Sequence, residues 1–162
     1  KGKYKEFKYY IPKNEGVEYP EQDLFIDPYI LGLGLGDGCF TNSRHHNLDF
    51  ASTIPDMEKY KEYINYEVHT RDDRHHSIRI PNIGKQLTFY NLIDTKCRTK
   101  FIPNDYKYNT RTNRFEILKG LMDTDGTVGH NGKVSFSTVS DQLSKDMLTL
   151  LMWHYLKWHC LK

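Results

Sequence analysis

Hydrophobic residues in the first part of this chain recur at two spacings, one typical of helices and one typical of strands. Positions three and four apart place apolar side chains on one face of a helix, whereas alternate positions place them on one face of a strand. These spacings predict, in order, a helix over 27–37, strands over 39–44 and 47–52, a helix over 55–65, strands over 66–71 and 75–80, and a helix marked by Ile83, Leu87, Tyr90 and Ile93. The expected order is αββαββα, and it closes near residue 94.

Capping residues support the limits of the first helix. Asp27 favours a helix start because its carboxylate accepts a hydrogen bond from a free N–H group, and Pro28 has the backbone angle of a first helical position. We expect the helix to run to about Asp37 and to stop at Gly38. Residues 1–26 are irregular and lysine-rich, and we interpret them as an extension or linker.

A second run of helical and strand spacing begins at residue 111. Its first helix is expected to end at Gly126, and the alternating residues that follow predict a hairpin with its turn at Asn131-Gly132. Asp141 is expected to cap a last helix. The apolar face of that helix consists of Leu143, Met147, Leu150 and Leu151.

The order of elements therefore repeats. We expect an α+β fold made of two pseudo-symmetric αββαββα copies, with a first half-domain over 27–110 and a second over 111–162. Because 37 residues follow Asp125, from 126 to 162, the second copy is expected to be shortened to αββα. Such an arrangement predicts a monomer with internal pseudo-twofold symmetry.

Two short segments carry the repeat most clearly. Residues 30–38 read ILGLGLGDG and residues 118–126 read LKGLMDTDG, at an offset of 88 positions. A further likeness joins FAST at 50–53 to FST at 136–138. Each segment is an apolar run that places a carboxylate at the end of its helix. The identical pairs are Gly32 and Gly120, Leu33 and Leu121, Asp37 and Asp125, and Gly38 and Gly126.

Small residues within these segments predict close packing of the two helices. Gly32 and Gly36 in the first segment, and Gly120 and Thr124 in the second, lie four positions apart on one helix face. Helices that meet through small residues can bring their backbones close together, as was first described for membrane helices. Carboxylates at the helix ends would then lie together, as Mg²⁺ or Mn²⁺ requires for metal-dependent phosphodiester chemistry. The candidate metal ligands are Asp37, Asp125, Gly36 and Thr124.

The two segments resemble the paired motifs of the LAGLIDADG homing endonucleases, in the dodecapeptide form found inside inteins. DPYILGLGLGDG is similar to the first block of that family, and FEILKGLMDTDGTV is similar to the second. Between them, KFIP at 100–103 resembles the lysine-bearing block, and the likeness extends over residues 24–157. The resemblance implies a site-specific double-stranded DNA endonuclease in which the motif helices form the interface between half-domains.

The resemblance also implies roles for three catalytic residues. Asp37 and Asp125 would be the metal-binding acids, and Lys100 would help to activate water or stabilise charge on the phosphate. A flanking splicing module in the same precursor is a further expected partner.

Strand alternation predicts which side chains face the DNA. If Val68, Ile78 and Ile80 pack under the helices, their chain neighbours point to the opposite face. Polar and charged residues on that face can contact base edges and phosphates. The residues expected to contact DNA from this sheet and from the two hairpins are Arg44, Asn47, Asp49, Glu67, His69, Arg71, Ser77, Arg79, Lys133 and Ser135.

Composition narrows the choice of partners only slightly. A net charge of +2 over 162 residues gives no global positive field, so any DNA-binding surface has to be local. Three widely spaced cysteines without a C-x-x-C pair indicate neither a structural zinc site nor a disulfide framework, as is usual inside cells. No apolar run approaches the length of a membrane span, so we expect an intracellular protein without a membrane partner.

Two other functions fit the same sequence. An RNA-binding intron maturase uses the same architecture, although an RNA-binding role has no chemical need for both Asp37 and Asp125. An inactive DNA-binding remnant is favoured by the short second unit and by Gly34, because a glycine inside a helix costs about 1 kcal/mol relative to alanine. A dinucleotide-binding loop is excluded, because Asp37 stands where that pattern requires its third glycine.

Overall fold

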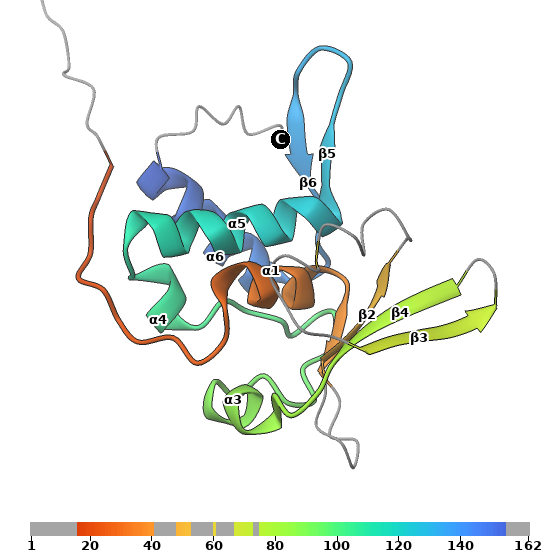
Figure 1. The fold of residues 1–162 in the computed structure, drawn as a ribbon. Coiled ribbons are helices and arrows are strands. Elements are labelled where there is room, and N and C mark those ends of the chain that lie inside the picture. The colour runs from red at the N-terminus through yellow and green to blue at the C-terminus, as the bar shows by residue number, and fades with distance from the viewer. Residues whose placement is uncertain (1–15, 41–47, 53–59, 61–66, 73–74, 155–162) are drawn as a thin grey trace, which may run out of the picture.

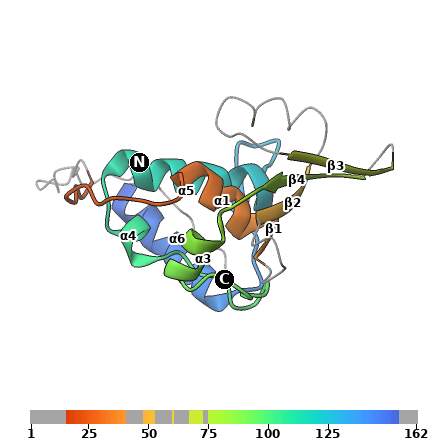
Figure 2. The same ribbon diagram turned by 60° about the horizontal axis from the view of Figure 1, so that its bottom comes forward.

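The computed structural model describes residues 16–40, 48–52, 60, 67–72 and 75–154. Within these ranges the helices are α1 (Pro28–Gly36), α3 (Gly84–Phe89), α4 (Asn104–Lys107), α5 (Arg111–Asp125) and α6 (Asp141–His154). The strands are β1 (Gly38–Phe40), β2 (Leu48–Ser52), β3 (Glu67–Asp72), β4 (His75–Ile80), β5 (Gly126–Val128) and β6 (Val134–Phe136). The predicted α+β class is confirmed. Helices α1 and α5 lie side by side at the centre, with the β-strands beyond one end of the pair (Figures 1 and 2).

Four antiparallel strands form the larger sheet, in the order β1-β2-β4-β3. Both hairpins predicted in the first half are confirmed, since β1 pairs with β2 and β3 pairs with β4. The predicted inward face is confirmed where side chains are described: the buried residues are Leu48, Phe50, Ile78 and Ile80. This face covers α1, because the Leu48 side chain packs against Gly34 in the middle of the helix.

The hairpin predicted after the second motif is present, but its turn is displaced by one residue. The Gly132 N–H donates to the Gly129 carbonyl at 2.9 Å, so His130 and Asn131 hold the central positions. Gly132 follows with a φ of +74°, which glycine adopts without steric cost. The Asn131 side chain accepts a hydrogen bond from the Lys133 N–H at 3.1 Å and so stabilises the turn.

The helix after β4 is shorter than its apolar spacing predicts. It ends at Phe89, although that spacing continues to Ile93. Asn91 adopts a φ of +56°, and the Leu92 N–H donates to the Leu87 carbonyl at 2.8 Å. This is the Schellman arrangement, which ends a helix by satisfying its last carbonyls.

The start of α6 also differs from the prediction by one residue. Ser140 is the N-cap, since its Oγ accepts a hydrogen bond from the Leu143 N–H at 3.1 Å, and Asp141 lies in the first turn. Serine and aspartate cap helices about equally well, so the pattern alone did not distinguish them. By contrast, Asp27 caps α1 as predicted, accepting from the Ile30 N–H at 3.1 Å.

Residues 16–26 are packed against α4 and the start of α5 and do not form a free linker. The Tyr106 hydroxyl lies 3.2 Å from the N–H of Ile26 and 2.8 Å from its carbonyl, and it bonds to both. The buried Arg114 guanidinium donates to the Val17 carbonyl, and burial lowers the pKa of this arginine. These contacts fix the segment across α4 and the start of α5.

Some expected elements concern residues outside the described ranges. The helix predicted over 55–65 is one of them, apart from Tyr60, which is helical and buried. The short helix α4 was not predicted, because its four residues are too few to show a helical period. None of the helices in the described part of the chain combines the length and apolar character needed to cross a membrane.

Candidate active site

Helices α1 and α5 contact each other backbone to backbone. A Cβ atom added to Gly32 would lie 2.4 Å from the carbonyl oxygen of Ile117. One added to Gly120 would lie 2.2 Å from the carbonyl oxygen of Tyr29. Both distances are well inside van der Waals contact, so no side chain fits at either position without separating the helices.

These contacts are reciprocal under the repeat of 88 positions. Tyr29 is equivalent to Ile117 and Gly32 to Gly120, so each glycine meets the equivalent of the residue that the other glycine meets. Crossed contacts of this kind are the mark of a twofold axis between two surfaces. The hairpins that follow the two helices also begin alike. In each, the glycine of the Asp-Gly pair lies opposite a phenylalanine, with the pairs Gly38–Phe50 and Gly126–Phe136.

The glycines of the two Asp-Gly pairs are required by packing against their own helices. A Cβ at Gly38 would lie 2.4 Å from the Gly34 carbonyl oxygen, and one at Gly126 would lie 2.3 Å from that of Met122. Neither glycine has a positive φ. Both Asp-Gly pairs therefore turn the chain directly from a helix into a strand, which places the two carboxylates at equivalent points.

The two carboxylates form an electrostatically coupled pair. Burial raises the pKa of Asp125, the negative charge of Asp37 raises it further, and Lys100 opposes both effects. Because α1 and α5 run in the same direction, their C-terminal ends add negative partial charge at the same place. This concentration of negative charge favours a bound cation.

Lys100 lies beside this pair, 7% exposed. Its Nζ donates to the carbonyl oxygens of Gly34 at 3.2 Å and of Gly36 at 2.6 Å, at the C-terminal end of α1. Burial lowers the pKa of Lys100, and the carboxylates of Asp125 and Asp37 oppose that effect. An ammonium group has three N–H donors, so one donor remains beyond these two carbonyls.

A pocket of about 330 Å³ opens next to the lysine. The connection from β6 to α6 forms one wall of it and brings two hydroxyl groups to the site, although sequence reasoning did not select these residues. The likeness between FAST at 50–53 and FST at 136–138 was the available signal. The lining residues are Leu35, Gly36, Cys97, Lys100, Asp125, Ser137, Thr138 and Val139.

Two of the expected metal ligands form hydrogen bonds within the protein. The Gly36 carbonyl accepts from Lys100, and the Thr124 hydroxyl donates to the Leu121 carbonyl at 3.0 Å. The Thr124 side chain occupies the space that a Cβ on Gly36 would need, so both residues belong to the helix interface. Among the described residues, no group of three or more His, Cys, Asp or Glu side chains is placed to hold a metal. The two carboxylates of the site are those of Asp37 and Asp125.

The outer face of the larger sheet carries a row of charges. Arg79 on β4 lies directly between Asp49 on β2 and Glu67 on β3. Its Nε donates to the Asp49 carboxylate at 2.8 Å, and this hydrogen bond raises the pKa of Arg79. Ser77 lies on the same face, two residues before Arg79. The described part of this face therefore mixes both signs of charge.

The remaining DNA-binding candidates are less completely placed. Lys133 and Ser135 are exposed on the β5–β6 hairpin, where the Ser135 hydroxyl lies 2.7 Å from that of Thr127. Arg44 and Asn47 lie outside the described residues. His69 and Arg71 belong to β3, and their side chains lie outside what the structure describes.

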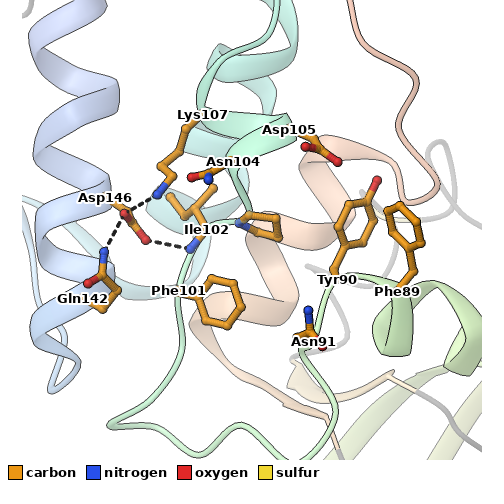
Figure 3. A pocket seen from close by; sticks show the side chains of 11 residues that line it. Phe89, Tyr90, Asn91, Phe101, Ile102, Asn104, Asp105, Lys107, Gln142 and Asp146 are labelled. Atoms are coloured by element: carbon orange, nitrogen blue, oxygen red, sulfur yellow. Dashed lines mark hydrogen bonds and ion pairs between the residues drawn. The ribbon is translucent and has the colours of Figure 1, made fainter.

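A second pocket, of about 350 Å³, lies between α3, α4 and α6 (Figure 3). Its buried carboxylate is Asp146, whose two oxygens accept hydrogen bonds from Ile102, Lys107 and Gln142. A carboxylate with this many donors is already satisfied within the protein. The pocket beside Lys100 is therefore the better candidate for chemistry.

Comparison with known proteins gives one informative similarity. No protein-family model matches the chain. The chain is 28% identical over 136 residues to the replicative DNA helicase DnaB of Mycobacterium intracellulare. The match covers 84% of this chain and 20% of the helicase, so the chain spans about a fifth of the length of that relative.

Proposed function

We propose that this chain is a site-specific double-stranded DNA endonuclease of the LAGLIDADG type that hydrolyses phosphodiester bonds with a divalent metal. One observation carries the proposal: Asp37 and Asp125 end two helices that touch glycine to glycine, and the buried Lys100 interacts electrostatically with both carboxylates while it donates to the end of α1. A carboxylate pair with an adjacent cation is a recurring arrangement for hydrolysis of phosphodiesters.

The reciprocal helix contact supports a duplex as the substrate. The two strands of a DNA duplex are related by local twofold symmetry, and proteins that read both strands often share that symmetry. The crossed contacts of Gly32 and Gly120 give α1 and α5 such a relation. Each carboxylate would then approach one of the two strands.

The donor set fits Mg²⁺ or Mn²⁺. Two carboxylates and two helix C-termini concentrate negative charge, and Lys100 offsets only part of it. Mg²⁺ commonly uses one or two carboxylates and completes its shell with water and phosphate oxygens. When bound, the metal supplies an activated water and stabilises the leaving oxygen.

The carboxylate pair and the groups that line the pocket have separate tasks in this proposal. The carboxylates of Asp37 and Asp125 would hold the metal at the ends of α1 and α5. The free N–H of Lys100 donates to an oxygen of the phosphate as its negative charge grows. Ser137 and Thr138 offer hydroxyl groups to the same pocket.

The similarity to the helicase supports a precursor context. A match confined to one fifth of a longer relative is compatible with an endonuclease segment carried inside a larger polypeptide. We therefore propose that the chain is the endonuclease segment of an intein, with a splicing module in the same precursor.

Cleavage of a randomised duplex library tests this function. We expect cleavage at a defined site when Mg²⁺ is present and none after chelation with EDTA, because the proposed mechanism takes its activated water from the metal. Sequencing of the cut ends measures the outcome. A protein that cuts nothing and prefers RNA would be a maturase, and one that binds duplex without cutting would be an inactive remnant; either result overturns the proposal.

We also propose that the outer face of the larger sheet contacts DNA, and this gives a second expected result. Arg79→Ala should weaken duplex binding and reduce the slope of log affinity against log salt by about one, as the loss of one phosphate contact does. Asp49→Asn is the matched control, since it removes the opposing charge and should strengthen binding. Titrations of labelled duplex at several salt concentrations measure both. An unchanged slope in Arg79→Ala would show that this face does not contact phosphate.

A further inference from the structure

Lys100 is held from two sides of the molecule. Its side chain is bound by α1, through the carbonyl oxygens of Gly34 and Gly36. Its main chain is bound by α6, because the Lys100 carbonyl accepts a hydrogen bond from the Ser140 hydroxyl at 2.6 Å. The lysine thus bridges the first motif helix and the last helix.

Both hydrogen-bonding directions of the Ser140 hydroxyl are used. The side chain is buried, with 1% exposed, and its Oγ accepts from the Leu143 N–H at 3.1 Å while it donates to Lys100. The first bond caps α6, and the second ties the capped end to the lysine. A substitution at this position can therefore remove the bond that caps α6, the bond to Lys100, or both.

A second residue of α6 holds the other end of the same short segment. The Asp146 carboxylate accepts from the Ile102 N–H at 2.8 Å and from Lys107 Nζ at 2.7 Å. Figure 3 shows this carboxylate on α6 facing the main-chain nitrogen of Ile102. The backbone from Lys100 to Ile102 is therefore pinned at both ends by one rigid helix.

We propose that Ser140 is a positioning residue for Lys100: by holding the lysine main chain on α6, it sets the reach of Nζ toward the carboxylate pair. This inference rests on the proposed endonuclease function. A lysine side chain is long and flexible, so its ammonium group is preorganised only when its backbone is fixed. A displacement of about 1 Å at a catalytic group can cost about 100-fold in rate.

Three substitutions at Ser140 separate the two bonds. Ser140→Thr keeps a hydroxyl and so keeps both. Ser140→Asp keeps an N-cap acceptor but has no proton to donate to Lys100, and Ser140→Ala loses both bonds. Met147→Ala is the control for stability alone, because Met147 is a buried core residue of the same helix. Unfolding midpoints, kcat and KM are measured for each full-length variant.

We expect kcat to fall about 10- to 100-fold in both Ser140→Ala and Ser140→Asp, with KM unchanged and with Ser140→Thr close to wild type. Met147→Ala should lose stability without this loss of kcat. Two results would overturn the proposal: a Ser140→Asp variant as fast as Ser140→Thr, or a Met147→Ala variant as slow as Ser140→Ala at equal loss of stability.

A spectroscopic readout keeps the inference testable if the wild-type protein does not cleave, a result that would refute the function alone. The buried Lys100 ammonium should give a slowly exchanging signal in a ¹⁵N-correlated NMR spectrum, assigned by its absence in Lys100→Met. The signal should persist in Ser140→Thr and should broaden or vanish in Ser140→Ala and Ser140→Asp. An identical signal in all of these Ser140 variants would show that Ser140 does not position Lys100.

Discussion

Replacing Asp125 with asparagine is expected to reduce DNA cleavage by about 10³-fold or more while duplex binding is retained. Asparagine has nearly the same shape as aspartate but lacks its charge, so the donor set would lose half of its carboxylates. Asp37 would then be the one carboxylate left to hold the metal, which makes a weaker site than the pair. Cleavage rates and binding titrations on the same duplex measure the two effects separately.

Asp123→Asn is the matched control for this experiment. It removes an equal charge two residues earlier on α5, where the Asp123 carboxylate accepts a hydrogen bond from the Tyr29 hydroxyl at 2.9 Å. Asp123 does not line the pocket beside Lys100. We expect this variant to cleave within about threefold of wild type, since the charge of the exposed Asp123 is screened by solvent and salt. Comparable activity of Asp125→Asn and the wild-type protein would refute the proposed role of the carboxylate pair.

Gly120→Ala is expected to destabilise the fold by about 3 kcal/mol or more, which is a large part of the stability of a domain of this size. The added methyl group would lie 2.2 Å from the Tyr29 carbonyl and 2.9 Å from the Gly32 Cα, and both are backbone atoms. Relief therefore requires α1 and α5 to move apart. The midpoint of urea unfolding measures the loss.

Gly129→Ala gives the comparison that isolates the helix contact. Gly129 lies in the β5–β6 turn, and a Cβ there would lie 3.2 Å from the Asn131 side chain and 3.5 Å from the Lys133 carbonyl. Those neighbours can shift at little cost, so we expect a change below about 1 kcal/mol. Equal stability of the two variants would mean that the close approach of α1 and α5 does not limit stability.

Elements with strong local signals were predicted well. Both limits of α1 follow from Asp27-Pro28 and Asp37-Gly38, and the end of α5 follows from Asp125-Gly126. The described strand pairs follow from alternation. The prediction for α3 extended too far, because the left-handed turn at Asn91 interrupts an apolar spacing that itself continues. The cap of α6 differed because Ser140 and Asp141 are adjacent and both favour a helix start.

In the candidate site, too, some residues were predictable from the sequence and other contacts were not. The pattern of residues was enough to select Asp37, Asp125 and the small residues of the two helices, because each of these depends on a repeat visible along the chain. The partners of Lys100 were not visible, because the lysine meets Gly34 and Ser140 at separations of 66 and 40 positions. The ion pair between Arg79 and Asp49 likewise depends on strand order and register.

Spacing along the chain therefore determines which residues end the helices and which face of each strand is polar, because helical and strand periods are local properties. Packing in three dimensions decides that α1 and α5 touch through Gly32 and Gly120 in a crossed, twofold manner. It also decides that the helix end beside the acids is capped by Lys100, and that residues 16–26 join the body of the protein. These contacts depend on the order and direction of packed elements, which no local pattern encodes.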